Sequence, residues 1–238
     1  MEQAKKEVPA PGEDAVGREI SGLEDDVRSF VRMVRKEGAP WEELEFSFGM
    51  GGEAPVSIEV EGGSIQLRGI IDRLDCPGGD LELEGIRVID YKTGRNTKDF
   101  RQGTRVFNGG RRLQLGLYAL AVEERLSRQV ETGEYHYPTR GGQNELFSFR
   151  RDQLVESVGS LVGHMLQGVA DGRFIPTEDK EDCSYCDYSE VCRVEKSDYG
   201  GVTSSPLAEW SEKYLKDSDL TPPALTPLKK VREFEDDG

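Results

Sequence analysis

The stretches GIIDRLD (residues 69–75) and VIDYKTG (residues 88–94) decide how this sequence is expected to fold. In both, an aspartate follows a run of apolar residues, which is typical of a buried strand. Asp90 and Lys92 are two residues apart, so on a strand they project from the same face. A turn, CPGGD (residues 76–80), separates the two stretches, and pairing of the strands would bring Asp72 beside Asp90.

Two carboxylates at one buried point are costly unless a cation neutralises them. Oxygen ligands of this kind suit Mg²⁺ or Mn²⁺. Such a metal can activate a bound water, and Lys92 could orient that water or offset charge on a phosphate. The alternative is an Asp–Lys salt bridge at a strand end, with Asp72 and Arg73 as surface charges. The D-x-K spacing alone favours the salt bridge and is weak evidence for a metal site.

Around these stretches, the hydrophobic pattern changes period several times. A capping box, Ser21 with Glu24, predicts a helix to about Lys36. Alternating apolar residues predict a β-meander that feeds a central strand over Ile86–Tyr91. The remaining expected elements are a helix over 111–129, strands near 135–137 and 146–149, and a long helix from Asp152 to Gly172. This order predicts an α/β fold with a mixed central sheet flanked by helices.

The segment QLGLY (residues 114–118) places Gln114 and Tyr118 on one face of a helix. Together with the two aspartate stretches, it resembles the core of the PD-(D/E)xK nuclease superfamily, in its RecB/AddB-like exonuclease branch. The resemblance covers about residues 43–195 and implies a restriction-endonuclease-like core. It also implies that the catalytic residues are Asp72, Asp90, Lys92, Gln114 and Tyr118, with Mg²⁺ or Mn²⁺ on Asp72 and Asp90.

Three cysteines follow the predicted long helix with the spacing Cys183-x2-Cys186-x5-Cys192. Free thiols this close bind soft metals, but three ligands are one short of the usual four. In iron–sulfur nucleases of the RecB type, such a group follows the nuclease core and the fourth cysteine lies well upstream. The resemblance therefore implies a [4Fe–4S] cluster, with Zn²⁺ as the alternative and the fourth ligand not identified in this chain.

The N-terminal side departs from that family pattern. Cys76 is the only other cysteine, in the turn beside the proposed metal site, and we interpret it as a turn residue rather than the fourth ligand. The family's early motif with an active-site histidine is also missing, because the first histidine is His136. We expect an N-terminally truncated form, that is, the C-terminal part of a longer protein.

The charge distribution bears on a DNA partner. The net charge of −15 argues against nucleic acid, yet residues 92–112 hold seven basic residues and one acidic residue. A local basic stripe can still meet a phosphate backbone, although a solvated charged loop is the alternative. The expected DNA-binding residues are Arg95, Lys98, Arg101, Arg105, Arg111 and Arg112.

The remaining signals concern partners and location. The chain has no apolar run of about 18 residues and no apolar signal region, so we expect a cytoplasmic protein without a membrane partner. It has no G-x-x-x-x-G-K-[ST] loop, so unwinding would come from a helicase subunit or a missing N-terminal region. We expect a disordered segment over 1–20, a nuclease domain over 21–197 that includes the cysteine motif 183–192, and an acidic, proline-containing tail over 198–238.

The leading hypothesis is a metal-dependent DNA exonuclease of repair or recombination, working as the nuclease part of a helicase–nuclease. A second hypothesis is a catalytically inactive module of nuclease fold that binds DNA ends or a partner and uses its cysteines as a structural clasp. A third is a zinc-stabilised interaction domain in which the D-x-K spacing is incidental.

Overall fold

The computed structural model describes residues 12–37, 41–76, 85–94, 106–174, 186–188 and 226–234. The chain divides into two compact units. The first comprises residues 1–58, 66–106 and 114–155, and the second comprises residues 59–65, 107–113 and 156–238.

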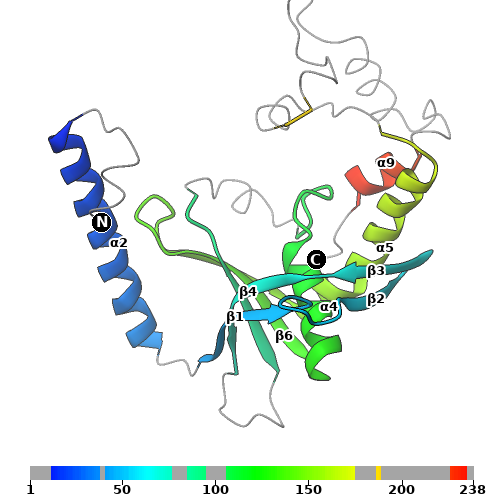
Figure 1. The fold of residues 1–238 in the computed structure, drawn as a ribbon, viewed down its shortest axis with the longest axis horizontal. Helices are drawn as coiled ribbons and strands as arrows, with labels where there is room; N and C mark the ends of the chain where they lie inside the picture. The colour runs from blue at the N-terminus through cyan, green and yellow to red at the C-terminus, as the bar shows by residue number, and fades with distance from the viewer. Residues whose placement is uncertain are drawn as a thin grey trace, which may run out of the picture. The chain divides into compact units, whose positions relative to one another are not determined.

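A five-stranded mixed sheet organises the fold (Figure 1). Its strands stand in the order β1-β4-β5-β6-β7, and β5 pairs with β6 in parallel while the other neighbours are antiparallel. The bounds are β1 Trp41–Phe48, β4 Gly69–Asp75, β5 Ile86–Tyr91, β6 Val130–Tyr137 and β7 Glu145–Arg150. This mixed sheet with its helices confirms the predicted fold class.

The predicted β-meander is wrong in one respect. β2 (Val56–Val60) and β3 (Gly63–Leu67) form a separate two-stranded sheet, and β1 pairs directly with β4. The chain turns between β2 and β3 at Gly62, whose φ of +86° favours glycine. Alternation marks all these segments as strands, but it carries no information about which strand pairs with which.

Within the described residues, four α-helices accompany the strands: α2 (Glu13–Glu37), α4 (Gln114–Leu126), α5 (Arg151–Ala170) and α9 (Thr226–Arg232). α2 begins before the predicted capping box, so residues 13–20, expected to be disordered, are helical. The reason is that Val16 and Ile20 extend the helical spacing of Leu23 and Val27 backwards. α9 lies in the segment predicted as a tail, and the short helix expected near 207–215 lies outside the described residues.

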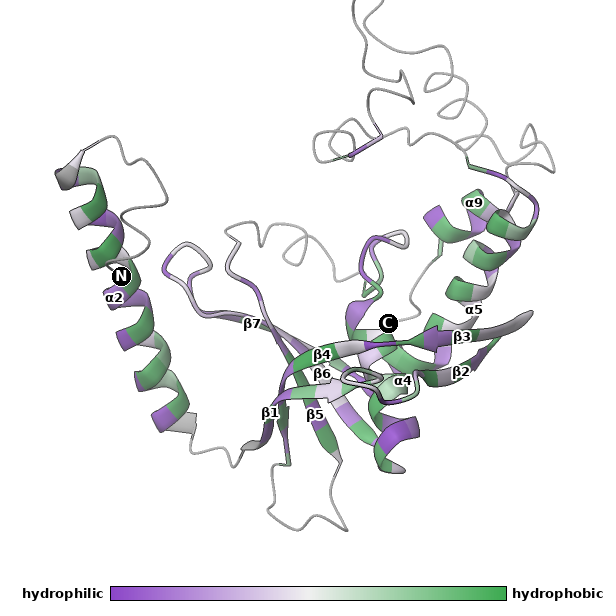
Figure 2. Cartoon of the chain, viewed as in Figure 1, coloured by the Kyte–Doolittle hydropathy of each residue, from purple (hydrophilic) through white to green (hydrophobic). Residues whose placement is uncertain are grey.

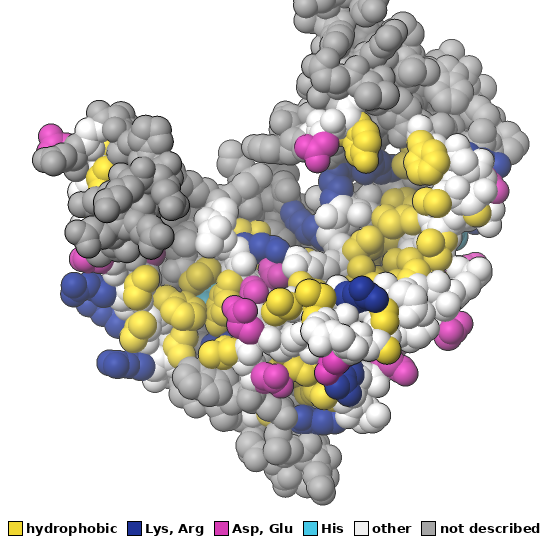
Figure 3. Space-filling model, viewed as in Figure 1, with side chains coloured by type: hydrophobic (Ala, Val, Ile, Leu, Met, Phe, Trp, Pro, Cys, Tyr) yellow, Lys and Arg dark blue, Asp and Glu magenta, His cyan; other side chains and the backbone are white. Residues whose placement is uncertain are grey.

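α2 is amphipathic, with hydrophobic and hydrophilic bands along its length (Figure 2). Phe30 packs edge-on against Tyr91 of β5, with 5.3 Å between the ring centroids. Leu23 and Val27 instead remain 63% and 59% exposed. Hydrophobic side chains stand beside charged ones on the drawn surface of the molecule (Figure 3). α2 therefore buries only part of its apolar surface among the described residues.

The core of the first unit lies where α4 packs on the central strands β5 and β6. Ile86, Val88 and Val130 have no exposed surface there. Gly133 of β6 permits a close approach of both helices, because an added Cβ would lie 2.7 Å from Leu154 Cδ1 of α5 and 3.4 Å from Leu115 Cβ of α4. This packing fixes α4, and with it Gln114, relative to the ends of β4 and β5. No helix in the described part of the chain combines the length and the apolar character needed to span a bilayer.

Candidate active site

The ladder between β4 and β5 brings two aspartates together. Arg73 pairs with Ile89 in antiparallel register, so the next pair along the ladder is Asp72 opposite Asp90. Asp72 is also held by β5 directly, since its Oδ2 accepts a hydrogen bond of 2.7 Å from the backbone N–H of Tyr91. Asp90 is only 3% exposed, whereas Asp72 is half-buried.

Lys92 completes this end of the strand pair. Its Nζ lies 2.6 Å from Asp90 Oδ2 and donates a 2.6 Å hydrogen bond to Gln114 Oε1. The same ammonium stands 5.3 Å from the ring centroid of Tyr135, a cation–π distance. With three contacts around it, the ammonium has a defined position even though its side chain is 35% exposed.

The N-terminal end of α4 supplies the other two predicted residues. Gln114 uses its amide in both directions, because Oε1 accepts from Lys92 while Nε2 donates to the Tyr118 hydroxyl at 2.9 Å. Tyr118 packs edge-on against Phe48 of β1, with 6.2 Å between centroids. The spacing of four residues places Gln114 and Tyr118 on one face of α4. The structure thus brings Asp72, Asp90, Lys92, Gln114 and Tyr118 together within the first unit.

Burial and like charge shape the protonation of this group. Burial raises the pKa of Asp90 above its ordinary value; the neighbouring Asp72 adds to the rise and Lys92 opposes it. Burial also raises the pKa of Tyr118, and the charges of Asp90 and Asp72 add to that rise against the hydrogen bond with Gln114. Tyr118 therefore keeps its proton at neutral pH and can donate it in a hydrogen bond.

The donor set fits a hard divalent cation in part. Asp72 and Asp90 offer carboxylate oxygens at one point, which suits Mg²⁺ or Mn²⁺. Among the described residues there is no group of three His, Cys, Asp or Glu side chains that could hold a metal ion. Mg²⁺ commonly binds through one or two carboxylates and completes its shell with water and substrate phosphates, so two carboxylates are sufficient for that mode.

A cavity of about 440 Å³ opens beside Asp72. Arg73 and Tyr91 line it, together with the apolar side chains of Phe30 and Val34 of α2. Glu45 of β1 also lines it, and this residue has a left-handed backbone with a φ of 55°. The sequence contains no motif that would have singled out Glu45, and the contact of Tyr135 with Lys92 was not predicted either.

A buried ion cluster supports the strands behind the site. Arg73 is 2% exposed and binds both oxygens of Asp75, at 2.5 and 2.6 Å. Arg87 of β5 reaches Asp75 Oδ2 at 2.6 Å, and Arg73 also donates to the Tyr91 hydroxyl at 3.2 Å. The interpretation of Arg73 as a surface charge is therefore wrong. These contacts tie β4 to β5 and fix the register that juxtaposes Asp72 and Asp90.

The remaining predicted residues lie elsewhere or outside the described part. Arg111 is exposed and Arg112 is half-buried. Both lie in the turn that precedes α4, and this turn belongs to the second unit. Arg95, Lys98, Arg101 and Arg105 lie outside the described residues, as do Cys183 and Cys192. Cys186 is described and exposed.

Cys76 is not beside the two aspartates. It follows Asp75 at the far end of β4, four residues or about 13 Å along the strand from Asp72. Its side chain is buried, and its Sγ accepts a hydrogen bond of 3.0 Å from Arg128 Nη2. The structure therefore corrects the expectation that this turn adjoins the proposed metal site.

Comparison with known proteins gives the evolutionary context. A family model described as "PD-(D/E)XK nuclease superfamily" matches residues 2–193. The chain is 45% identical over 83 residues to a subunit of the ATP-dependent helicase/deoxyribonuclease of Symbiobacterium thermophilum, covering 34% of this chain and 7% of that protein. It is 29% identical over 171 residues to the Gene 69 protein of Mycobacterium phage D29, covering 68% of this chain and 51% of that protein.

Both alignments thus span about half or less of the relative's own length. Among solved structures, the crystal structure of SSO0001 superposes with a TM-score of 0.42 at 17% identity, covering 77% of this chain and 71% of that one. The family model extends over most of the chain, including all five residues gathered at the ends of β4, β5 and α4. This chain belongs to the PD-(D/E)XK nuclease superfamily.

Proposed function

We propose that this chain is a divalent-metal-dependent DNA nuclease, acting as an exonuclease of the RecB/AddB-like branch in DNA repair or recombination. The observation that carries the proposal is the convergence of Asp72, Asp90 and Lys92, with the ammonium 2.6 Å from Asp90 and from Gln114. A structural salt bridge alone would not require a second carboxylate at the same point, where like charges repel.

The two aspartates are the residues that would hold Mg²⁺ or Mn²⁺. When bound there, the metal supplies Lewis-acid stabilisation of the phosphate and lowers the pKa of a water. Asp90 would bind it with a buried oxygen that is in contact with Lys92, and Asp72 with a half-buried carboxylate anchored on the Tyr91 N–H.

Lys92, Gln114 and Tyr118 would act on the phosphate and the attacking water. An ammonium has three N–H donors, so Lys92 retains one beyond its contacts with Asp90 and Gln114. The Tyr118 hydroxyl accepts from Gln114, which leaves its own proton available for a phosphate oxygen. Lys92 would offset the charge that grows on the phosphate during hydrolysis.

The partner proposal follows from one relative. The protein from Symbiobacterium thermophilum is named as a subunit of an ATP-dependent helicase/deoxyribonuclease, and this chain matches 7% of it. We propose accordingly that this chain supplies the nuclease part of a helicase–nuclease.

The test is hydrolysis of linear DNA with Mg²⁺ or Mn²⁺ by the wild type, Asp90→Asn and Lys92→Ala. Asp152→Asn is a matched control, because Asp152 is an exposed aspartate paired with Arg150 at the start of α5. We expect cleavage by the wild type and the control, abolished by EDTA and lowered at least about 100-fold in the two site variants. Equal cleavage by all four proteins would refute the assignment.

One observation favours a second candidate. Only two carboxylates meet at the site, and no third His, Cys, Asp or Glu joins them among the described residues. A catalytically inactive module that binds DNA ends would fit this reduced set. Such a module would bind linear DNA in the experiment above and leave it intact with either metal.

For the cysteines we propose a cluster held by Cys183, Cys186 and Cys192, with [4Fe–4S] as the leading group and Zn²⁺ as the competitor. The support is their spacing, C-x2-C-x5-C, together with the resemblance of this motif to that of iron–sulfur nucleases of the RecB type. Anaerobically purified protein should absorb near ~400 nm as iron–sulfur thiolates do. A colourless protein with stoichiometric zinc would exclude the iron–sulfur cluster.

A further inference from the structure

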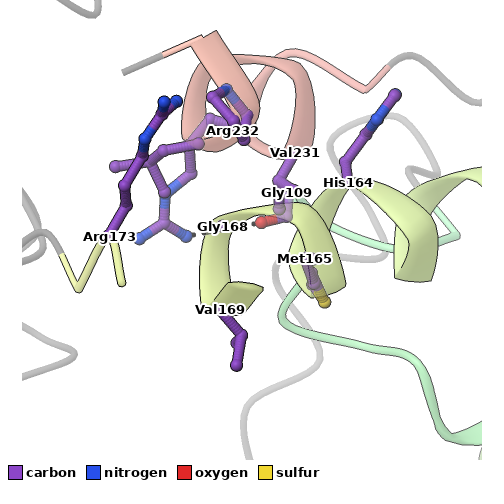
Figure 4. A pocket seen from close by; sticks show the side chains of 11 residues that line it. Gly109, His164, Met165, Gly168, Val169, Arg173, Val231 and Arg232 are labelled. Atoms are coloured by element: carbon purple, nitrogen blue, oxygen red, sulfur yellow. Dashed lines mark hydrogen bonds between the residues drawn. The ribbon is translucent and has the colours of Figure 1, made fainter. Parts of the chain in front are cut away.

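The second unit contains a cavity of about 260 Å³ that is separate in sequence from the aspartate site. Its walls come from the C-terminal half of α5, the turn at Gly109–Gly110 and the short helix α9 (Figure 4). Met165, Val169 and Val231 make part of the wall apolar. Its ionisable lining consists of Arg173, Arg232 and His164, and no aspartate or glutamate of the described segments lines it.

Close packing holds α9 in place on this turn. Gly109 and Gly110 both have left-handed backbones, with φ of 61° and 83°. A Cβ at Gly110 would lie 2.6 Å from Val231 Cγ1 and 2.7 Å from Met165 Cε, so only glycine allows Val231 to reach its buried position. Arg232 Nη1 donates to the Gly109 carbonyl at 3.3 Å, and this bond is drawn in Figure 4.

The charge around the cavity is positive, although the chain as a whole carries −15. Arg173 is paired with Asp171 at 3.1 Å, and its side chain remains 32% exposed. α9 adds Lys230, which is exposed, and Lys229, which contacts Glu233 at 2.9 Å. Guanidinium groups carry planar arrays of donors that match phosphate oxygens. They are also more weakly hydrated than ammonium groups, so they are better suited to binding a phosphate beside an apolar wall.

We propose that this cavity binds a phosphate of the DNA backbone, with Arg173 and Arg232 as its donors. The site would add a DNA contact made by α9 and the end of α5, in addition to the contacts of the aspartate site. The identity of the polymer rests on the proposed function, because the guanidinium donors match a phosphate group whatever molecule carries it. Free phosphate is the other source of the same group.

The test is DNA affinity in EDTA, where cleavage cannot occur, using fluorescence anisotropy of an end-labelled duplex over a series of salt concentrations. Arg173→Gln is compared with Arg150→Gln, a matched control. Arg150 is exposed and pairs with Asp152 at 2.8 Å, two residues away, as Arg173 pairs with Asp171. Each substitution removes one positive charge and leaves one aspartate behind.

We expect Arg173→Gln to weaken binding about tenfold. It should also lower the slope of log K against log salt by about 1, because one phosphate contact is lost. Arg150→Gln should match the wild type in both. Equal affinity and slope for the two variants, or no duplex binding by the wild type, would overturn the proposal.

A second arm separates the two sources of phosphate. Inorganic phosphate is titrated into the wild type and into Arg173→Gln at matched ionic strength, and binding is followed by calorimetry. If Arg173 is needed for inorganic phosphate but not for duplex affinity, the cavity takes free phosphate and the DNA proposal is wrong. None of these measurements depends on hydrolysis, so a failure to cleave DNA in the activity test and a failure of this binding proposal are distinguishable.

Discussion

Lys92→Met separates metal binding from hydrolysis at the proposed site. The ammonium lies 2.6 Å from an Asp90 oxygen, so a metal bound to that carboxylate would have a positive charge close by. Unit charges about 4 Å apart interact by about 4 kcal/mol at an effective dielectric constant of about 20. The side chain is about a third exposed, so we discount this repulsion to about 1–2 kcal/mol.

Removing the ammonium should therefore tighten metal binding by roughly 5- to 30-fold, by the conversion of about 1.4 kcal/mol per tenfold. Hydrolysis should nevertheless fall by about 100-fold or more, because the cation that offsets phosphate charge is gone. Calorimetric titration with Mn²⁺ at about pH 8 gives the first quantity, and degradation of labelled linear DNA gives the second.

Lys230→Met is a suitable control, because Lys230 is an exposed lysine of α9. It should leave Mn²⁺ affinity as in the wild type. Weaker Mn²⁺ binding by Lys92→Met would refute the reasoning, because it means that the ammonium does not repel the metal. Undiminished cleavage would also refute it, because it means that the ammonium does not offset the charge on the phosphate.

Three further predictions concern stability. The folded-state pKa of Asp90 is raised by burial, so the stability that this group contributes is present below its unfolded-state pKa and is lost as the pH rises through its folded-state pKa. Asp90→Asn should therefore raise the melting temperature at about pH 8 without metal and remove the increase in melting temperature that Mg²⁺ gives the wild type. An unchanged increase with Mg²⁺ would contradict this. Asp75→Ala should cost about 3–5 kcal/mol in urea unfolding, because Arg73 and Arg87 lose their buried partner; Asp152→Ala, at an exposed pair, should change little, and equal effects would be contrary evidence. Gly133→Ala should lower the free energy of unfolding by about 1–3 kcal/mol by overpacking against Leu154, whereas Gly159→Ala, in open space on α5, should raise it by about 0.5–1 kcal/mol. The reverse order of stability would show that the packing is misassigned.

Local pattern was sufficient for the elements that carry the site. Strand β5 has the predicted bounds Ile86–Tyr91, and α5 ends close to the predicted Gly172. The spacing of Asp90 and Lys92 on that strand, and of Gln114 and Tyr118 on α4, predicted which side chains would share a face. Their hydrogen bonds and ion pair are consistent with that geometry, while their catalytic roles remain predictions.

Long-range relations could not be obtained in this way. The direct pairing of β1 with β4 depends on contacts across the β2–β3 excursion, which alternation does not encode. The burial of Arg73 depends on Asp75 and Arg87 closing around it, and charge alone suggested a surface residue. The docking of Val231 against Gly110 joins segments that are far apart in the sequence, so composition suggested a tail where the structure has a packed helix.

The most direct test of the central claim is anomalous diffraction from crystals grown with Mn²⁺, for the wild type and for Asp90→Asn. The account predicts a manganese peak within coordination distance of one oxygen from Asp72 and one from Asp90, absent in the variant. A manganese ion bound only elsewhere, or one that persists at this position in the variant, would contradict the claim that these two aspartates form the metal site.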